Sequence, residues 1–144
     1  MNIILVEDDL DDRVAFAELV EKINLPISLH YASDSRELFA HLDKFPDVNL
    51  IFHDINMPLK NGKQCLKELK LNERHRHIPV LMYTASASQI DIDEVYEYGA
   101  HYYIVKPYAY VNMMETMKKI FSIDWTATQP IPSREDFVIN MTYN

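Results

Sequence analysis

The chain has 144 residues, 48% of them hydrophobic and 25% charged, which suits one globular domain with a sizeable core. Its formal net charge of −8 argues against direct binding of nucleic acid, for which a basic face is expected. Cys65 is the only cysteine, so an internal disulfide and a thiolate metal cluster are both excluded.

Short apolar runs alternate along the chain with longer amphipathic stretches. Several of the runs are continuous, as expected of strands that are covered on both faces. The predicted strands span residues 3–6, 27–31, 50–53, 80–83 and 102–105. The predicted helices between and after them span residues 10–23, 34–44, 61–72, 88–98 and 109–121.

Five strands that alternate with five helices predict an α/β fold. We expect a three-layer (βα)5 sandwich with a central five-stranded parallel sheet and flavodoxin-like topology over residues 1–121. Residues 122–144 are then a C-terminal extension, too short for an output domain. Its apolar side chains are costly to leave in water, so it should pack on its own domain, bridge a dimer or dock on a partner.

Polar side chains follow four of the five predicted strands. In chain order they are Glu7, Asp8 and Asp9 after the first strand, Asp54 after the third, Thr84 after the fourth and Lys106 after the fifth. A parallel sheet brings such positions to one edge, where ligands bind in folds of this kind. Converging carboxylates repel one another unless a cation joins them, and hard oxygen ligands favour Mg²⁺.

This set of groups matches the needs of phosphoryl transfer. A metal ion and an ammonium group neutralise the phosphoryl oxygens, a hydroxyl donates a hydrogen bond, and a carboxylate is the nucleophile. Each residue alone has a simpler explanation: acids after a strand suit a helix N-terminus, and Asp54 could be a turn aspartate. Together and in this order they predict a phosphoryl-transfer site.

In these motifs the sequence resembles the bacterial response-regulator receiver family, over residues 1 to about 121. The similar segments are Ile-Leu-Val-Glu-Asp-Asp at 4–9, His-Asp-Ile-Asn-Met-Pro at 53–58, Gly62, Tyr-Thr-Ala-Ser at 83–86 and Tyr-Ile-Val-Lys-Pro at 103–107. The resemblance implies a stand-alone receiver domain of a two-component system. Such a domain accepts a phosphoryl group from a sensor histidine kinase or phosphotransfer protein, with no other catalysis than its own phosphorylation and autodephosphorylation.

The resemblance also assigns a role to each site residue. Asp54 is expected to be the phosphoacceptor and, with Asp8 and the backbone carbonyl of Asn56, to bind Mg²⁺, while Glu7 acts through water. Thr84 is expected to donate a hydrogen bond to the phosphoryl group, and Lys106 to pair with it. The Lys106–Pro107 bond, typically cis in the family, is expected to be cis.

A conformational switch is implied in the same way. Tyr103 is similar to the aromatic residue that moves inward when the hydroxyl residue moves toward the phosphoryl group. The fourth and fifth helices and the strand between them then present a changed surface to a downstream partner protein. Two copies could form a homodimer through this surface or through the extension.

Other functions remain open at this point. A phosphatase of the haloacid dehalogenase type has Asp-x-Asp after its first strand, whereas here Asp54-Ile55-Asn56 follows the third and lacks the second acid. A phosphorylation-independent adaptor would use a receiver fold only for docking, but such receivers usually lose a pocket residue. With no basic leader and no apolar run near the ~20 residues that span a bilayer, we expect a cytoplasmic protein without membrane insertion.

Overall fold

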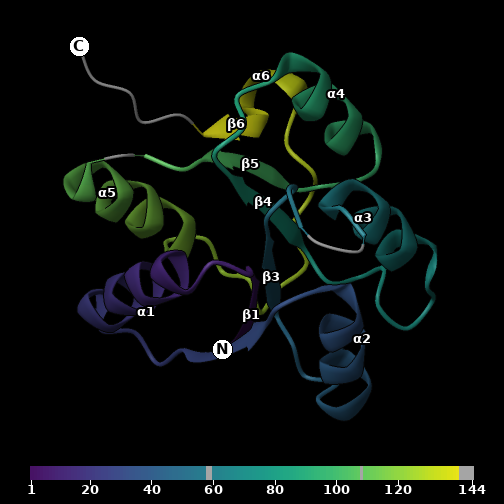
Figure 1. Ribbon diagram of the computed structural model, residues 1–144, viewed down its shortest axis with the longest axis horizontal. Helices are drawn as coiled ribbons and strands as arrows, with labels where there is room; N and C mark the ends of the chain where they lie inside the picture. The colour runs from purple at the N-terminus through teal and green to yellow at the C-terminus, as the bar shows by residue number, and fades with distance from the viewer. Residues whose placement is uncertain (58–59, 108, 140–144) are drawn as a thin grey trace.

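One parallel sheet with helices on both faces forms the computed structural model, which describes residues 1–57, 60–107 and 109–139 (Figure 1). The strands are β1 (Asn2–Val6), β2 (Ser28–Ala32), β3 (Leu50–His53), β4 (Val80–Thr84), β5 (Tyr102–Val105) and β6 (Val138–Ile139). The helices are α1 (Leu10–Ile23), α2 (Ser35–Lys44), α3 (Gly62–Leu71), α4 (Gln89–Glu97), α5 (Tyr110–Phe121) and α6 (Arg134–Phe137). The strand order is β2-β1-β3-β4-β5-β6, and all neighbours run parallel.

The five predicted strands and five predicted helices are all present, with ends within one residue of those expected. The prediction of a five-stranded sheet is one strand short, because the extension adds β6 beside β5. β6 is only two residues long and follows Pro130 and Pro132 closely, so the sequence contains no run of strand length to reveal it.

The helices divide between the two faces of the sheet, as Figure 1 shows, with α1 and α5 on one face and α2, α3 and α4 on the other. Three of them begin with a side-chain cap: Asp9, Asp34 and Asn61 each accept a hydrogen bond from the backbone amide three residues on. These caps satisfy amide groups that a helix N-terminus leaves without partners. Local sequence therefore sets where α1, α2 and α3 start.

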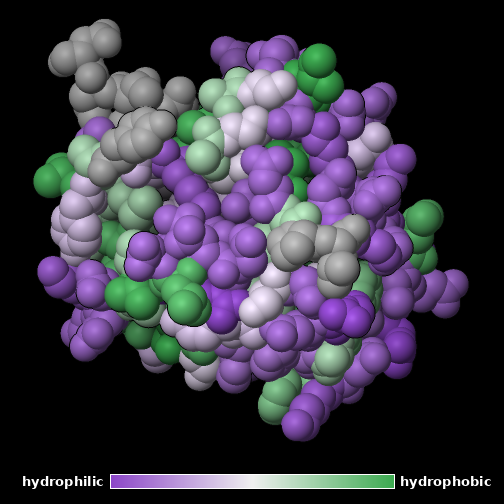
Figure 2. All heavy atoms as spheres, viewed as in Figure 1, coloured by the Kyte–Doolittle hydropathy of each residue, from purple (hydrophilic) through white to green (hydrophobic). Residues whose placement is uncertain are grey.

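The face of the molecule seen in Figure 2 is mainly hydrophilic. On this face, hydrophobic side chains form separate patches among polar ones. None of the helices formed by the described residues is long and apolar enough to cross a membrane.

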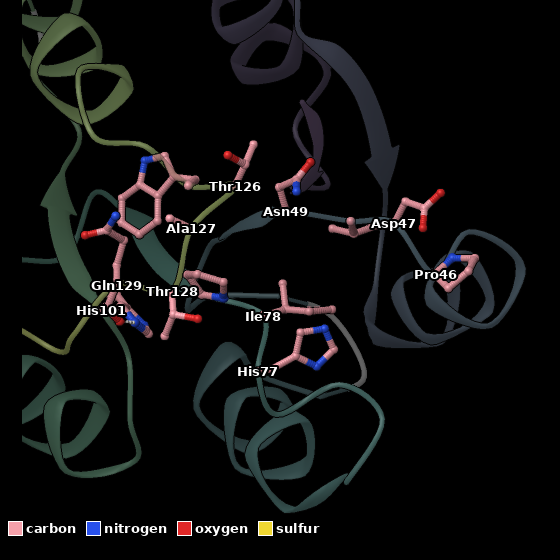
Figure 3. Close-up of a pocket in the computed structure, with 13 residues that line it drawn as sticks. Pro46, Asp47, Asn49, His77, Ile78, His101, Thr126, Ala127, Thr128 and Gln129 are labelled. Atoms are coloured by element: carbon pink, nitrogen blue, oxygen red, sulfur yellow. Dashed lines mark hydrogen bonds between the residues drawn. The ribbon is translucent and has the colours of Figure 1, made fainter.

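The described part of the extension packs on its own domain. Buried Trp125 donates a hydrogen bond from Nε1 to the carbonyl oxygen of Ile120 at 2.9 Å. The Nε2 atom of His101 lies 3.0 Å from the carbonyl oxygen of Gln129. With the residues that precede β3 and β4, the extension lines an open pocket of about 410 Å³ (Figure 3). This pocket lies at the amino-terminal ends of the strands, opposite the edge where the polar residues converge.

Candidate functional site

The carboxyl ends of the strands bring the predicted site residues together. Val6 of β1 pairs with His53 of β3, so the acids that follow these two strands are neighbours. One ligand oxygen each from Glu7, Asp8 and Asp54 lies within 4.8 Å of the others. Three carboxylates from two strand ends thus form one cluster.

Lys106 lies within ion-pair distance of three carboxylates at this site. Its Nζ atom is 2.5 Å from Oε1 of Glu7, 2.9 Å from Oδ2 of Asp12 and 3.5 Å from Oδ2 of Asp54. The Lys106 side chain is 12% exposed and that of Glu7 only 2%, so the first pair is shielded from water. The ammonium group balances part of the negative charge of the cluster.

Burial and pairing have opposite effects on these two groups. Burial raises the pKa of Glu7 to about 7, although the hydrogen bond from Lys106 opposes that rise. Burial alone would lower the pKa of Lys106, but its hydrogen bonds to Glu7 and Asp12 outweigh burial and raise the pKa. Lys106 therefore stays charged, and Glu7 is a carboxyl group that a further cation would help to keep ionised.

The chemistry of the donor set fits a hard divalent cation. All three side chains of the cluster offer carboxylate oxygens, and Asp8 is exposed, so solvent reaches the site. Such ligands suit Mg²⁺, which retains water molecules when it binds. The residues present therefore fit the metal that the sequence suggests.

The backbone after Asp54 is held close to the start of α3. The Gly62 amide donates a hydrogen bond to the carbonyl oxygen of Ile55 at 2.8 Å, and the Asn56 amide donates to Oδ1 of Asp54 at 3.3 Å. A Cβ atom at position 62 would lie 2.3 Å from the carbonyl oxygen of Asp54. Only glycine permits this approach, which explains its presence at that position.

Thr84 is the last residue of β4 and Tyr103 lies on the neighbouring strand β5, and both are 0% exposed. The Ser86 amide donates a hydrogen bond to Oγ1 of Thr84 at 3.4 Å, and the Tyr103 hydroxyl donates to the carbonyl oxygen of Ser86 at 2.9 Å. Tyr103 thus occupies the inward position in this structure. The prediction of a cis bond at Lys106–Pro107 is wrong, since the described residues contain no cis peptide bond and the trans form is generally favoured.

Two residues of the site were missed in the sequence, and both come from the first turn of α1. Asp12 accepts a hydrogen bond from Lys106, and Arg13 donates from Nε to the carbonyl oxygen of Glu7 at 2.7 Å. Asp12 lies three residues after the helix cap Asp9, a position in the helical turn nearest the strand end. That spacing indicates that Asp12 can lie near the strand end, but it does not reveal which acid of the first turn of α1 contacts Lys106.

Comparison with known proteins shows the family to which the chain belongs. Residues 3–118 match the family model described as the response regulator receiver domain. The chain is 32% identical over 121 residues to the chemotaxis protein CheY-3 of Vibrio cholerae, covering 84% of this chain and 92% of that protein. It is 29% identical over 139 residues to the response regulator Rcp1 of Synechocystis, covering 91% of this chain and 92% of Rcp1.

Two solved structures that resemble this chain are also response regulators. The Mn²⁺-bound form of Rcp1 superimposes with a TM-score of 0.75 at 28% identity, covering 92% of this chain and 99% of that one. The phosphorylated cyanobacterial phytochrome response regulator RcpA does so with a TM-score of 0.78 at 28% identity, covering 92% and 98%. The chain belongs to the response-regulator receiver family, and it is a response regulator of two-component signal transduction.

Proposed function

We propose that this response regulator receives its phosphoryl group on Asp54. In transfer from a phosphohistidine, a carboxylate oxygen of Asp54 attacks phosphorus, the phosphorus–nitrogen bond breaks, and the imidazole leaves with the bonding electron pair. The product is an acyl phosphate on Asp54. The observation that supports this proposal is the convergence of Glu7, Asp8 and Asp54 within 4.8 Å, with Lys106 3.5 Å from Asp54.

Four residues would provide the magnesium site. Asp8, Asp54 and the backbone carbonyl of Asn56 would bind Mg²⁺ directly, and Glu7 would act through water. A bound divalent cation supplies positive charge that neutralises the phosphoryl oxygens during transfer. Before metal binds, the Lys106 ammonium limits the repulsion among the acids.

Lys106 and Thr84 would recognise the phosphoryl group. The ammonium group pairs with the phosphoryl oxygens, and the hydroxyl donates a hydrogen bond to them. With Thr84 drawn toward Asp54 and Tyr103 inward, α4, β5 and α5 present a changed surface to a downstream protein. The same surface, or residues 122–144, would join two copies in a homodimer, and autodephosphorylation would reset the switch.

The phosphodonor would be a sensor histidine kinase or a phosphotransfer protein. In structure, RcpA, described as a phytochrome response regulator, covers 92% of this chain, against 83% for the chemotaxis response regulator CheY4 of Vibrio cholerae. The longer match favours a phytochrome-type kinase as donor. Faster transfer from the phosphorylated kinase core of a chemotaxis kinase than from that of a phytochrome kinase would contradict this choice.

The phosphoacceptor is tested by intact mass after incubation with Mg²⁺ and acetyl phosphate. We expect the wild type to gain the mass of one phosphoryl group, and only when Mg²⁺ is present. Asp54→Asn should gain none. Glu18→Gln removes an equal charge from an exposed position further along α1 and should react like the wild type.

Three results would contradict the proposal. An adduct on Asp54→Asn would place the phosphoryl group elsewhere. A wild type that gains no mass and also fails to bind beryllofluoride with Mg²⁺ would have a receiver fold without receiver chemistry, and would favour the phosphorylation-independent adaptor. Hydrolysis of phosphate monoesters with turnover would favour the aspartyl phosphatase instead.

A further inference from the structure

The extension covers the edge of the sheet and part of the surface that a downstream protein would contact. β6 pairs with β5, and α6 lies beside α4 (Figure 1). An Nη atom of Arg134 is 2.8 Å from Oδ1 of Asp93 on α4, and the Tyr96 hydroxyl donates a hydrogen bond to the carbonyl oxygen of Pro132 at 3.0 Å. The extension is thus tied to both β5 and α4.

Phe137 connects the extension to Tyr103. Their ring centroids are 6.3 Å apart, and both side chains are 0% exposed. The ring of Tyr96 on α4 meets Phe137 edge-on at a centroid distance of 4.8 Å. Aromatic rings in contact prefer particular relative orientations, so these contacts stabilise the observed positions of the three rings. Phe137 therefore supports Tyr103 in its buried position.

Tyr103 is connected in turn to the phosphorylation site. Its hydroxyl donates to the carbonyl oxygen of Ser86, and the Ser86 amide donates to the hydroxyl oxygen of Thr84. The Ser86 hydroxyl donates to Oδ2 of Asp91, in the first turn of α4, at 2.6 Å. A continuous series of contacts thus runs from Phe137 through Tyr103 to Thr84.

We propose that Phe137 is a positioning residue for the phosphorylation switch, holding Tyr103 in the inward position that a phosphoryl group on Asp54 favours through Thr84. The inference rests on the proposed function for the roles of Asp54 and Thr84. Two events that favour the same arrangement strengthen each other by the same factor. The docked extension therefore strengthens binding of the phosphoryl group or its analogue, and phosphorylation strengthens docking of the extension.

The test is a titration with beryllofluoride in saturating Mg²⁺, followed by NMR. We expect Phe137→Ala to weaken beryllofluoride binding about fivefold, at the lower end of typical coupling between sites. Phe137→Leu, which keeps an apolar side chain, should weaken it less. In a Tyr103→Ala background, Phe137→Ala should have no further effect, because the residue through which it acts is gone.

A matched control separates this contact from general loosening of the extension. Ile139 is also buried but belongs to the core cluster on the α1 and α5 face. Ile139→Ala should lower thermal stability as Phe137→Ala does, yet change beryllofluoride affinity by less than about twofold. In the wild type, hydrogen exchange of the β6 amides should slow about fivefold when beryllofluoride binds, since the coupling is reciprocal.

The outcomes are distinguishable. A wild type that binds no beryllofluoride overturns the proposed function, and this inference with it. A wild type that binds, with Phe137→Ala and Phe137→Leu binding equally well or more tightly, overturns only the role of Phe137. Phe137→Ala could also weaken beryllofluoride binding as much in the Tyr103→Ala background as in the wild type, or Ile139→Ala could weaken it as much as Phe137→Ala does. Either result would mean that the contact between Phe137 and Tyr103 carries no coupling.

Discussion

The Nζ atom of Lys106 lies 2.5 Å from Oε1 of Glu7 but 3.5 Å from Oδ2 of Asp54. Asp12 holds the same ammonium group at 2.9 Å. The lysine that should recognise the phosphoryl group is therefore paired mainly with two acids that are not phosphorylated. A phosphoryl group adds negative charge and acceptor oxygens at Asp54, so it must compete with Glu7 and Asp12 for this ammonium group.

Lys106→Met should increase the affinity for Mg²⁺. The substitution removes a positive charge from beside the carboxylates that would bind the metal, an effect of roughly 1–4 kcal/mol, the range between bulk water and a protein surface for two unit charges about 4 Å apart. Calorimetric titration with MgCl₂ measures it. Lys118→Met removes the same charge from an exposed position of α5 and serves as the control. Equal affinity of Lys106→Met and wild type would mean that Lys106 does not oppose metal binding.

Asp12→Asn should tighten beryllofluoride binding in saturating Mg²⁺. With Asp12 neutral, Lys106 loses an acceptor that competes with the phosphoryl group. Because the Asp12 side chain is 45% exposed, the expected gain is only about two- to fivefold. Asp11→Asn makes the same change of charge one residue away, on an exposed side chain, and should have less effect. Weaker binding by Asp12→Asn would show that Asp12 positions Lys106 for the phosphoryl group rather than competing for it.

The sequence predicts the main sheet and the acidic site because both depend on regular patterns. Continuous apolar runs define β1, β3 and β4, and parallel strands must end at one edge, so Asp54 meets Glu7 without further information. The position of Asp12 depends on how one helical turn faces a lysine 94 residues away, which no spacing rule specifies. β6 is a two-residue strand fixed by tertiary contacts such as the buried ring of Phe137, so its pattern is too short to recognise.

Gly62→Ala should destabilise the protein and impair the site together. The new methyl group would lie 2.3 Å from the carbonyl oxygen of Asp54, so backbone must shift at a cost of about 1–3 kcal/mol. Urea unfolding measures the loss, and Mg²⁺ affinity should fall with it.

Gly99→Ala is the control for the effect on the site. Gly99 has φ of 98°, which is unfavourable for alanine, but the nearest atom to an added Cβ is Cγ of Lys70 at 3.5 Å. This variant should lose stability and keep its Mg²⁺ affinity. Equal loss of Mg²⁺ affinity in both variants would mean that the contact between Gly62 and Asp54 has no special role.

His53 should make the folded state sensitive to acid. The ring is 0% exposed, its Nδ1 atom lies 2.6 Å from the carbonyl oxygen of Asp54, and Nε2 has no partner among the described residues. Burial lowers the pKa of His53 to about 4, from 6.5 in the unfolded chain. Between these two pH values the unfolded chain binds a proton that the folded protein does not, so the free energy of unfolding falls as the pH drops from 6.5 to 4.

His53→Leu removes this titration and keeps an apolar side chain of moderate size in the core. Urea unfolding at pH 7 and pH 4, without divalent cations, should show a larger loss of stability for the wild type than for the variant. The difference between the two losses should approach about 3 kcal/mol, since each unit of pKa shift corresponds to about 1.4 kcal/mol. The variant can differ from the wild type at pH 7, because it also loses the hydrogen bond to Asp54, but that offset does not depend on pH. Parallel losses in the two proteins would mean that the ring accepts a proton in the folded state, which would require a partner for Nε2 in solution.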